Sequence, residues 1–142
     1  MKKEINFNYE TGFKLTNEPV IRDWLVKASN QHDFFIVELN FVFCDDNYLL
    51  PINREYLNHD TLTDIITFDY SEGRNISGDI FISVERVREN ALDFNVDFTV
   101  EIIRVMGHGL LHLMGFGDKE EEEVALMRKK ENELIELFHV EH

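Results

Sequence analysis

Residues 108–118 read HGLLHLMGFGD, and this stretch decides both the fold and the chemistry that we predict for the chain. Two histidines four residues apart share one face of a helix, so their imidazoles can converge on one cation. Gly115 predicts the end of that helix, after which the chain can turn back towards the same ion. We therefore predict a metal site formed by His108, His112 and Asp118, which are also the candidate catalytic residues through the bound metal and its water.

Three protein ligands leave one coordination position open to water, as in catalytic rather than structural zinc sites. Zinc is the expected metal, one ion per chain, with manganese, iron or nickel as alternatives because a carboxylate makes the ligand set harder. The spacing is zincin-like, since it keeps both helical histidines and the glycine of the metzincin pattern H-E-x-x-H-x-x-G-x-x-H. Position 109 is glycine where those proteases carry their general base, which argues against a peptidase. We expect Gly109 to let substrate or another stretch of backbone approach the metal.

Outward from this stretch, hydrophobic periodicity predicts strands and helices along most of the chain. Residues 34–44 alternate at Val37, Leu39, Phe41 and Phe43, as a half-buried strand does. The helix that carries the histidines is apolar around most of its circumference, so we expect it to be buried. The predicted strands cover 4–9, 34–44, 65–69 and 78–84, and the predicted helices cover about 18–31, 47–57, 85–94, 97–115 and 119–138. This pattern indicates an α/β (α+β) fold, a small mixed sheet of about four strands covered by about five helices.

The size and composition of the chain favour one domain. The chain has 142 residues, 44% of them hydrophobic, and no long linker, so we expect a single metal-dependent hydrolase domain over residues 1–142. No run approaches the ~18 apolar residues of a membrane span, and the first residues do not resemble a signal peptide. The lone cysteine, Cys44, lies in an apolar run and is expected to be buried. These features together predict a cytoplasmic protein with no membrane partner.

The charge of the chain is strongly acidic, with 28 Asp and Glu against 14 Lys and Arg. A net charge of −14 argues against a passive nucleic-acid binder, but it does not exclude a nuclease whose metal meets the phosphate. Four basic residues flank the metal stretch and offer RNA a local foothold, unless they only balance the glutamates of the last helix. They are Lys119, Arg128, Lys129 and Lys130.

The same stretch resembles the signature H-G-x-L-H-L-x-G-x-D-H of the YbeY family, bacterial metal-dependent endoribonucleases. Residues 52–68 are similar to that family's L-N-x-x-Y-R-x-x-D-x-P-T-D-V-L-S-F, and residues 78–80 resemble its G-D-I strand, so the match spans about 50–135. The resemblance implies an α/β domain with one zinc. It also implies a single-strand-specific endoribonuclease that acts in 16S rRNA 3′-end maturation and ribosome quality control in the cytoplasm. Its implied partners are RNA and proteins of the small ribosomal subunit.

Several positions depart from the family's pattern. The third ligand of the family is a histidine, and its position is Asp118 here, so either Asp118 takes the ligand role or water replaces a protein ligand. The family's arginine after the tyrosine, thought to face phosphate, is Leu57 here. His59 lies two residues further on and is a candidate to contact the phosphate instead, the alternative being an exposed loop histidine. Asp64 either braces the following strand or takes part in chemistry, and Asp79 either orients a ligand histidine or ends a strand.

The leading hypothesis is metal-assisted cleavage of RNA phosphodiester bonds. With glycine at position 109, either metal hydroxide or the 2′-hydroxyl of the substrate supplies the nucleophile. One alternative is a zinc peptidase or amidohydrolase on the same metal geometry. The other is a non-catalytic ribosome assembly factor in which the metal braces the fold.

Overall fold

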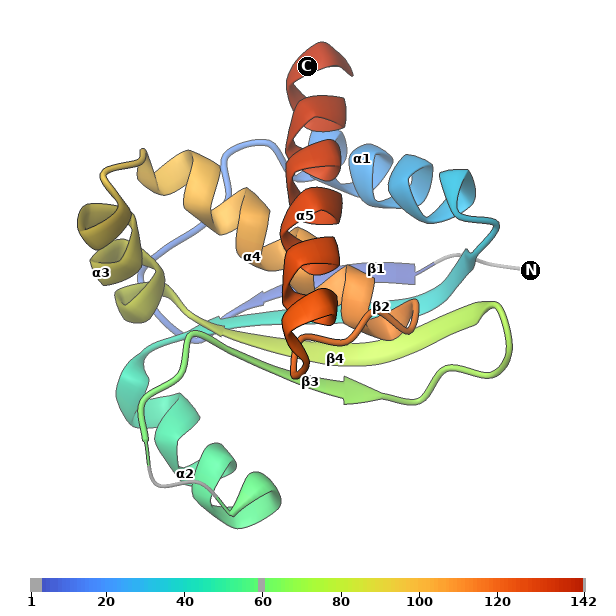
Figure 1. Cartoon of the computed structure of the whole chain (residues 1–142). Coiled ribbons are helices and arrows are strands. Elements are labelled where there is room, and N and C mark those ends of the chain that lie inside the picture. The colour runs from blue at the N-terminus through green and yellow to red at the C-terminus, as the bar shows by residue number, and fades with distance from the viewer. Residues whose placement is uncertain (1–3, 59–60, 142) are drawn as a thin grey trace.

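The strands of this chain form one mixed sheet in the order β1-β2-β4-β3 (Figure 1). The computed structural model describes residues 4–58 and 61–141. The strand bounds are β1 Glu4–Tyr9, β2 Phe35–Cys44, β3 Ile65–Asp69 and β4 Asn75–Ser83. Strands β1, β2 and β4 run parallel, whereas β3 pairs antiparallel with β4 and forms one edge of the sheet.

Helices cover both faces of this sheet. Their bounds are α1 Glu18–Gln31, α2 Asp46–Leu57, α3 Val84–Phe94, α4 Phe98–Leu113 and α5 Glu121–Glu141. In Figure 1, α1, α4 and α5 lie on one side of the sheet and α2 lies on the other. The predicted fold class is therefore confirmed: the described residues form four strands and five helices, and all nine predicted elements are present.

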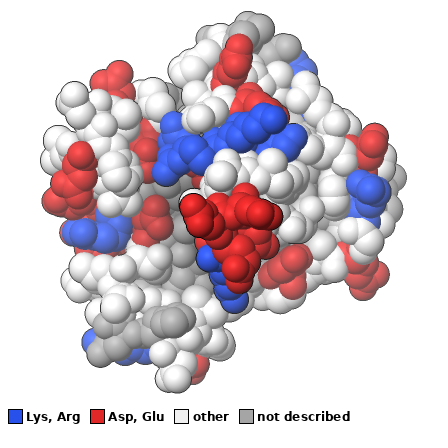
Figure 2. Space-filling model, in the orientation of Figure 1, with Lys and Arg blue, Asp and Glu red and all other residues white. Residues whose placement is uncertain are grey.

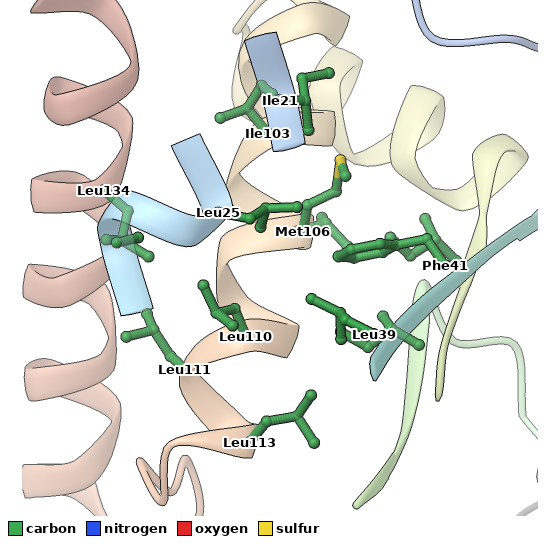
Figure 3. Packing of buried hydrophobic residues seen from close by; sticks show 14 of the residues in the cluster. Ile21, Leu25, Leu39, Phe41, Ile103, Met106, Leu110, Leu111, Leu113 and Leu134 are labelled. Carbon is green, nitrogen blue, oxygen red and sulfur yellow. The ribbon is translucent and has the colours of Figure 1, made fainter. Parts of the chain in front are cut away.

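The main hydrophobic core lies between the sheet and the helices α1, α4 and α5. Met106 and Leu110 of α4 point towards Leu39 and Phe41 of β2, as Figure 3 shows. The helix α4 is buried along most of its length because apolar side chains cover nearly its whole circumference. This packing fixes α4, and with it the two histidines, against the sheet.

A smaller apolar cluster lies under α2 on the other face of the sheet. Cys44, Leu49 and Ile66 are its buried members, with Ile52, Phe68 and Phe81 packed against them. The helix begins after Asp45, whose carboxylate accepts a hydrogen bond from the Tyr48 amide at 2.8 Å. The prediction that Cys44 is buried is confirmed.

Two details of the sheet differ from the predictions. The pairing of β2 with β4 shifts register between Ile36 and Glu38, so Ile36 is buried and Val37 is only half-buried, contrary to the simple alternation. Strand β4 begins at Asn75 rather than at residue 78, because Asn75 pairs with Phe35 across the sheet and exchanges hydrogen bonds with Glu72 in the preceding turn. Within the described residues, none of the helices combines the length and the apolar character that crossing a bilayer requires.

Candidate metal centre

The two predicted ligand histidines lie on one face of the last turns of α4. The Nε2 atoms of His108 and His112 are 2.9 Å apart, and the two rings meet edge to face. Towards the start of the helix the same face carries Glu101 and Arg104, so a polar stripe runs along an otherwise apolar helix. The predicted convergence of the two imidazoles is present in the structure.

Asp118 reaches the histidines because the chain reverses directly after α4. Gly115 has a φ of +96°, a conformation that glycine adopts without strain, and the Phe116 amide donates back to the Leu111 carbonyl at 3.0 Å. The Asp118 Oδ2 atom then lies 3.2 Å from His112 Nε2 and 3.4 Å from His108 Nε2. One ligand atom from each of the three residues therefore falls within 4.8 Å of the other two.

The outer nitrogens of both imidazoles are held by acceptors. His108 donates from Nδ1 to the Glu131 carboxylate at 2.6 Å, and His112 donates from Nδ1 to the Phe116 carbonyl at 2.9 Å. Because a carboxylate and a carbonyl only accept, each neutral imidazole carries its hydrogen on Nδ1 and turns the lone pair of Nε2 inwards. Two nitrogen lone pairs and a carboxylate oxygen thus converge on one point, and this donor set fits zinc or a similar divalent ion.

Glu131 of α5 holds His108 and is itself held by two arginines. It is almost fully buried, and Arg104 and Arg128 place their Nη1 atoms 3.1 and 3.4 Å from its Oε1 atom. Burial alone would raise the pKa of Glu131, but the hydrogen bond and charge of His108 and the nearby arginines outweigh burial and lower it. Burial opposes the charged form of His108, yet the hydrogen bond to Glu131 and its charge raise the pKa of His108 overall. Glu131 is therefore an ionised acceptor at neutral pH.

Glu131 and Arg104 were not among the site residues predicted from the sequence. A signal was present, because Glu131 lies four residues after Met127 and three before Leu134, on the inner stripe of the last helix. A charged residue on such a stripe is buried only when it is paired. Val124, three residues before Met127, is 50% exposed, although its spacing alone would place it on the same stripe.

Asp79 neither orients a histidine nor ends a strand, because it lies in the middle of β4, so both alternatives are wrong. Its carboxylate instead accepts a hydrogen bond from Asn40 at 3.0 Å across the neighbouring strand. Asp64 behaves mainly as a brace, because its carbonyl accepts from the Ser83 amide at 2.9 Å and its carboxylate accepts from Asn90 at 3.4 Å. Burial raises the pKa of Asp64. His59 lies outside the described residues.

Gly109 has a packing role rather than the role of admitting substrate. A Cβ atom at this position would lie 2.8 Å from the Cδ1 atom of Ile80 and 3.1 Å from that of Ile65, both on the sheet. The glycine thus lets α4 approach the sheet closely, which differs from our expectation that it lets substrate or another stretch of backbone approach the metal. A glutamate here would meet the packed sheet and not the metal site.

The candidate metal centre opens into a cavity of about 690 Å³. Its walls include the three candidate ligands, the edge strand β3, and Leu57 and Phe94, both partly exposed. The Asp118 side chain is 40% exposed, whereas those of His108 and His112 are 21% and 27% exposed, so the cluster is accessible from the cavity side. The point where the three ligand atoms converge is therefore open to solvent on the cavity side.

Comparison with known proteins gives one consistent result. The family model described as "Endoribonuclease YbeY" matches residues 4–139. A protein of that name from Flavobacterium johnsoniae is 58% identical over 137 residues, which is 96% of this chain and 99% of the relative. One from Christiangramia forsetii is 54% identical over 140 residues, covering 99% and 98% of the two chains. The solution structure of TM1509 from Thermotoga maritima, 22% identical, has the same fold, with a TM-score of 0.69 over 97% of this chain and 90% of that one.

Proposed function

The chain belongs to the endoribonuclease YbeY family, and on this premise we propose that it cleaves single-stranded RNA with a metal ion held by His108, His112 and Asp118. The observation that carries the proposal is the convergence of two imidazole nitrogens and one carboxylate oxygen at the wall of a large open cavity. We further propose that residues 1–142 form one hydrolase domain and that zinc is its resident metal.

The residues around the cluster prepare it for this chemistry. When bound, a divalent cation supplies Lewis acidity towards a phosphoryl oxygen and lowers the pKa of a coordinated water from ~16 towards ~7. Glu131 and the Phe116 carbonyl hold the two imidazoles with Nε2 directed inwards, so little reorganisation is needed when the ion binds. The carboxylate of Asp118 brings a negative charge to the exposed side of the cluster, where it partly offsets the charge of the ion.

The packing of Gly109 against the sheet argues against the peptidase alternative. A side chain at position 109 would start in the packed contact with Ile80 and Ile65 of the sheet, not on the helix face that carries the two histidines. The general base of the metzincins thus has no counterpart at this position. We infer that the nucleophile is either water activated at the metal or the 2′-hydroxyl of the substrate. The ends of the RNA fragments distinguish these routes, since attack by the 2′-hydroxyl leaves a 2′,3′-cyclic phosphate.

We propose 16S rRNA as the substrate, its 3′ end as the site of maturation, and proteins of the small ribosomal subunit as partners in the cytoplasm. The proposal is supported by the resemblance of the metal stretch and of residues 52–68 to the family's motifs. A defect in the 3′ end of 16S rRNA in cells that lack the protein, corrected by the wild-type chain, is the expected result.

The test of catalysis replaces His112 with alanine and compares RNA digestion with digestion of a peptide library. We expect the wild-type protein to cut RNA and not peptides, and His112→Ala to fold normally but lose RNA cleavage. His139→Ala is the matched control, because His139 is an exposed histidine on α5. If a folded His112→Ala protein still cuts RNA and still corrects ribosome defects, catalysis at this cluster is contradicted and the assembly-factor alternative is favoured.

A further inference from the structure

The cavity beside the metal centre must accept a polyanion although its charged lining residues are mainly acidic. Among the described residues that line it, five are carboxylates and three are cations. The carboxylates are Asp64, Asp69, Glu101, Asp118 and Glu131, and the cations are Arg104, Lys119 and Arg128. A chain with a net charge of −14 gives RNA no long-range attraction, so a phosphate must be held by a specific local contact.

The donors of Arg104 are already engaged in contacts within the protein. Its side chain is 19% exposed, and its Nη1 atom donates to Glu131 at 3.1 Å and to Asn132 at 3.0 Å. Its Nε atom also lies 3.7 Å from Glu101. A phosphate would have to displace these contacts and leave the buried Glu131 with less compensation, so Arg104 stabilises the site and is a poor phosphate ligand.

Arg128, in contrast to Arg104, is exposed and makes a single ion pair with Glu131. Its side chain is 58% exposed, and its contact with Glu131 is a 3.4 Å ion pair made by one of its two terminal nitrogens. No contact with another described residue is seen for the other donors of the guanidinium, so they can form the paired hydrogen bonds that suit a phosphate. Lys119 is exposed as well, but an ammonium on a flexible stem offers a point charge without this geometry.

The position of Arg128 ties it to the reaction centre. Glu131 contacts Arg128 through Oε1 and His108 through Oε2, so one carboxylate separates the guanidinium from a candidate metal ligand. Leu57 and Phe94 line other parts of the cavity, on α2 and α3, which lie apart from α5 in Figure 1. Basic side chains form a band across the face on which α5 lies, next to a compact acidic cluster, as Figure 2 shows. The cations of α5 thus favour binding of RNA phosphates on that side of the cavity. Leu57 and Phe94 offer apolar surface for RNA bases on the other side.

We propose that Arg128 binds a backbone phosphate of the RNA strand in this cavity and thereby positions the strand at the metal centre. This role rests on the proposed ribonuclease function. Arg128 would then supply a phosphate ligand from α5. Residue 57, where the family's pattern has an arginine, also lines the cavity but is an uncharged leucine here.

The experiment compares Arg128→Gln with Lys129→Gln. Lys129 is another of the basic residues that flank the metal stretch, but the structure places it on the exposed surface of α5 and not in the cavity lining. Binding of a cleavage-resistant single strand, with 2′-O-methyl and phosphorothioate groups, is measured by fluorescence anisotropy at several salt concentrations with the zinc-loaded protein. We expect Arg128→Gln to raise the Kd roughly tenfold and to reduce the salt slope by about 0.7. Arg128→Lys should restore the slope because it restores the charge. Lys129→Gln should change neither quantity, and metal content should stay constant throughout.

The outcomes separate this proposal from the one on which it rests. If the wild-type protein binds and cleaves RNA but Arg128→Gln behaves like Lys129→Gln, Arg128 is not the phosphate ligand and the ribonuclease function stands. If the Arg128→Gln effect comes with loss of metal, the residue acts through Glu131 and the proposal is overturned. If the wild-type protein neither binds nor cleaves RNA, the ribonuclease function fails and this role fails with it.

Discussion

At the scale of single residues, His108 owes its orientation to a carboxylate from another helix. Glu131 lies 23 residues after His108 in the chain, yet its Oε2 atom is 2.6 Å from the Nδ1 atom of that histidine. Partners of this kind fix both the tautomer and the ring orientation of a metal ligand. The almost complete burial of Glu131 means that the hydrogen bond competes little with water.

We predict that Glu131→Gln weakens metal binding by about 10- to 100-fold, because an amide is a weaker acceptor for the His108 N–H than a carboxylate. Competition with a coloured chelator measures the metal dissociation constant directly. Glu133→Gln, two residues along the same helix and exposed, is the control and should bind metal as the wild type does. Equal affinities of the two variants would show that Glu131 does not support the ligand.

At the scale of elements, the approach of α4 to the sheet depends on positions without side chains. A Cβ atom on Gly78 of β4 would lie 2.7 Å from the carbonyl oxygen of Phe68 and 2.9 Å from the Cδ2 atom of Leu113. The Phe68 oxygen is backbone of the neighbouring strand β3, so β3 and β4 would have to shift against each other, and the Leu113 side chain at the end of α4 would have to move as well.

Gly78→Ala should therefore lower the free energy of unfolding by roughly 1–3 kcal/mol, the usual cost of overpacking a well-packed site. Urea titration followed by circular dichroism measures this change. Gly12→Ala is the control, because a Cβ atom at Gly12 has nothing within 4 Å. A Gly78→Ala protein as stable as Gly12→Ala would contradict the close packing described here.

The end of β2 gives a prediction that depends on pH. Burial raises the pKa of the Cys44 thiol to about 12, with a further contribution from Asp45 and Asp46. The native state favours the neutral thiol, so its stabilising contribution is complete below pH 9 and is lost as the pH rises from about 9 to about 12. We expect the native thiol to resist a thiolate-specific reagent at pH 8 and to react fully in denaturant. Rapid labelling of the native protein at pH 8 would contradict the burial of Cys44.

The helices and strands could be predicted from the sequence because their hydrophobic patterns are local. The predictions failed where the burial or the role of a residue depends on contacts between elements far apart in the chain. Periodicity located every strand and helix, and a spacing of four residues placed His108 and His112 together. The half-burial of Val37 depends on a register shift against β4, which no local pattern in β2 reveals. The role of Glu131 likewise depends on how α5 packs against α4, a contact between residues far apart in the chain.

At the scale of the whole molecule, the acidic surface and the metal centre have separate consequences for RNA. The net charge of −14 disfavours non-specific binding of nucleic acids. Without this repulsion, the protein would bind weakly to any RNA. On the proposed function, the attraction for the substrate comes from the metal ion and from a few cations at one cavity. The same proposal restricts productive binding to strands that reach the cavity between α4, α5 and β3.

The most direct test of the account is elemental analysis of the purified protein, wild type against Asp118→Ala, after growth with zinc. We predict about one zinc per wild-type chain and little or none in the variant, because two imidazoles alone hold the ion weakly. Glu122→Ala, an exposed acidic residue nearby, should keep its full complement. Full metal in Asp118→Ala, or none in the wild type, would contradict the ligand set of His108, His112 and Asp118.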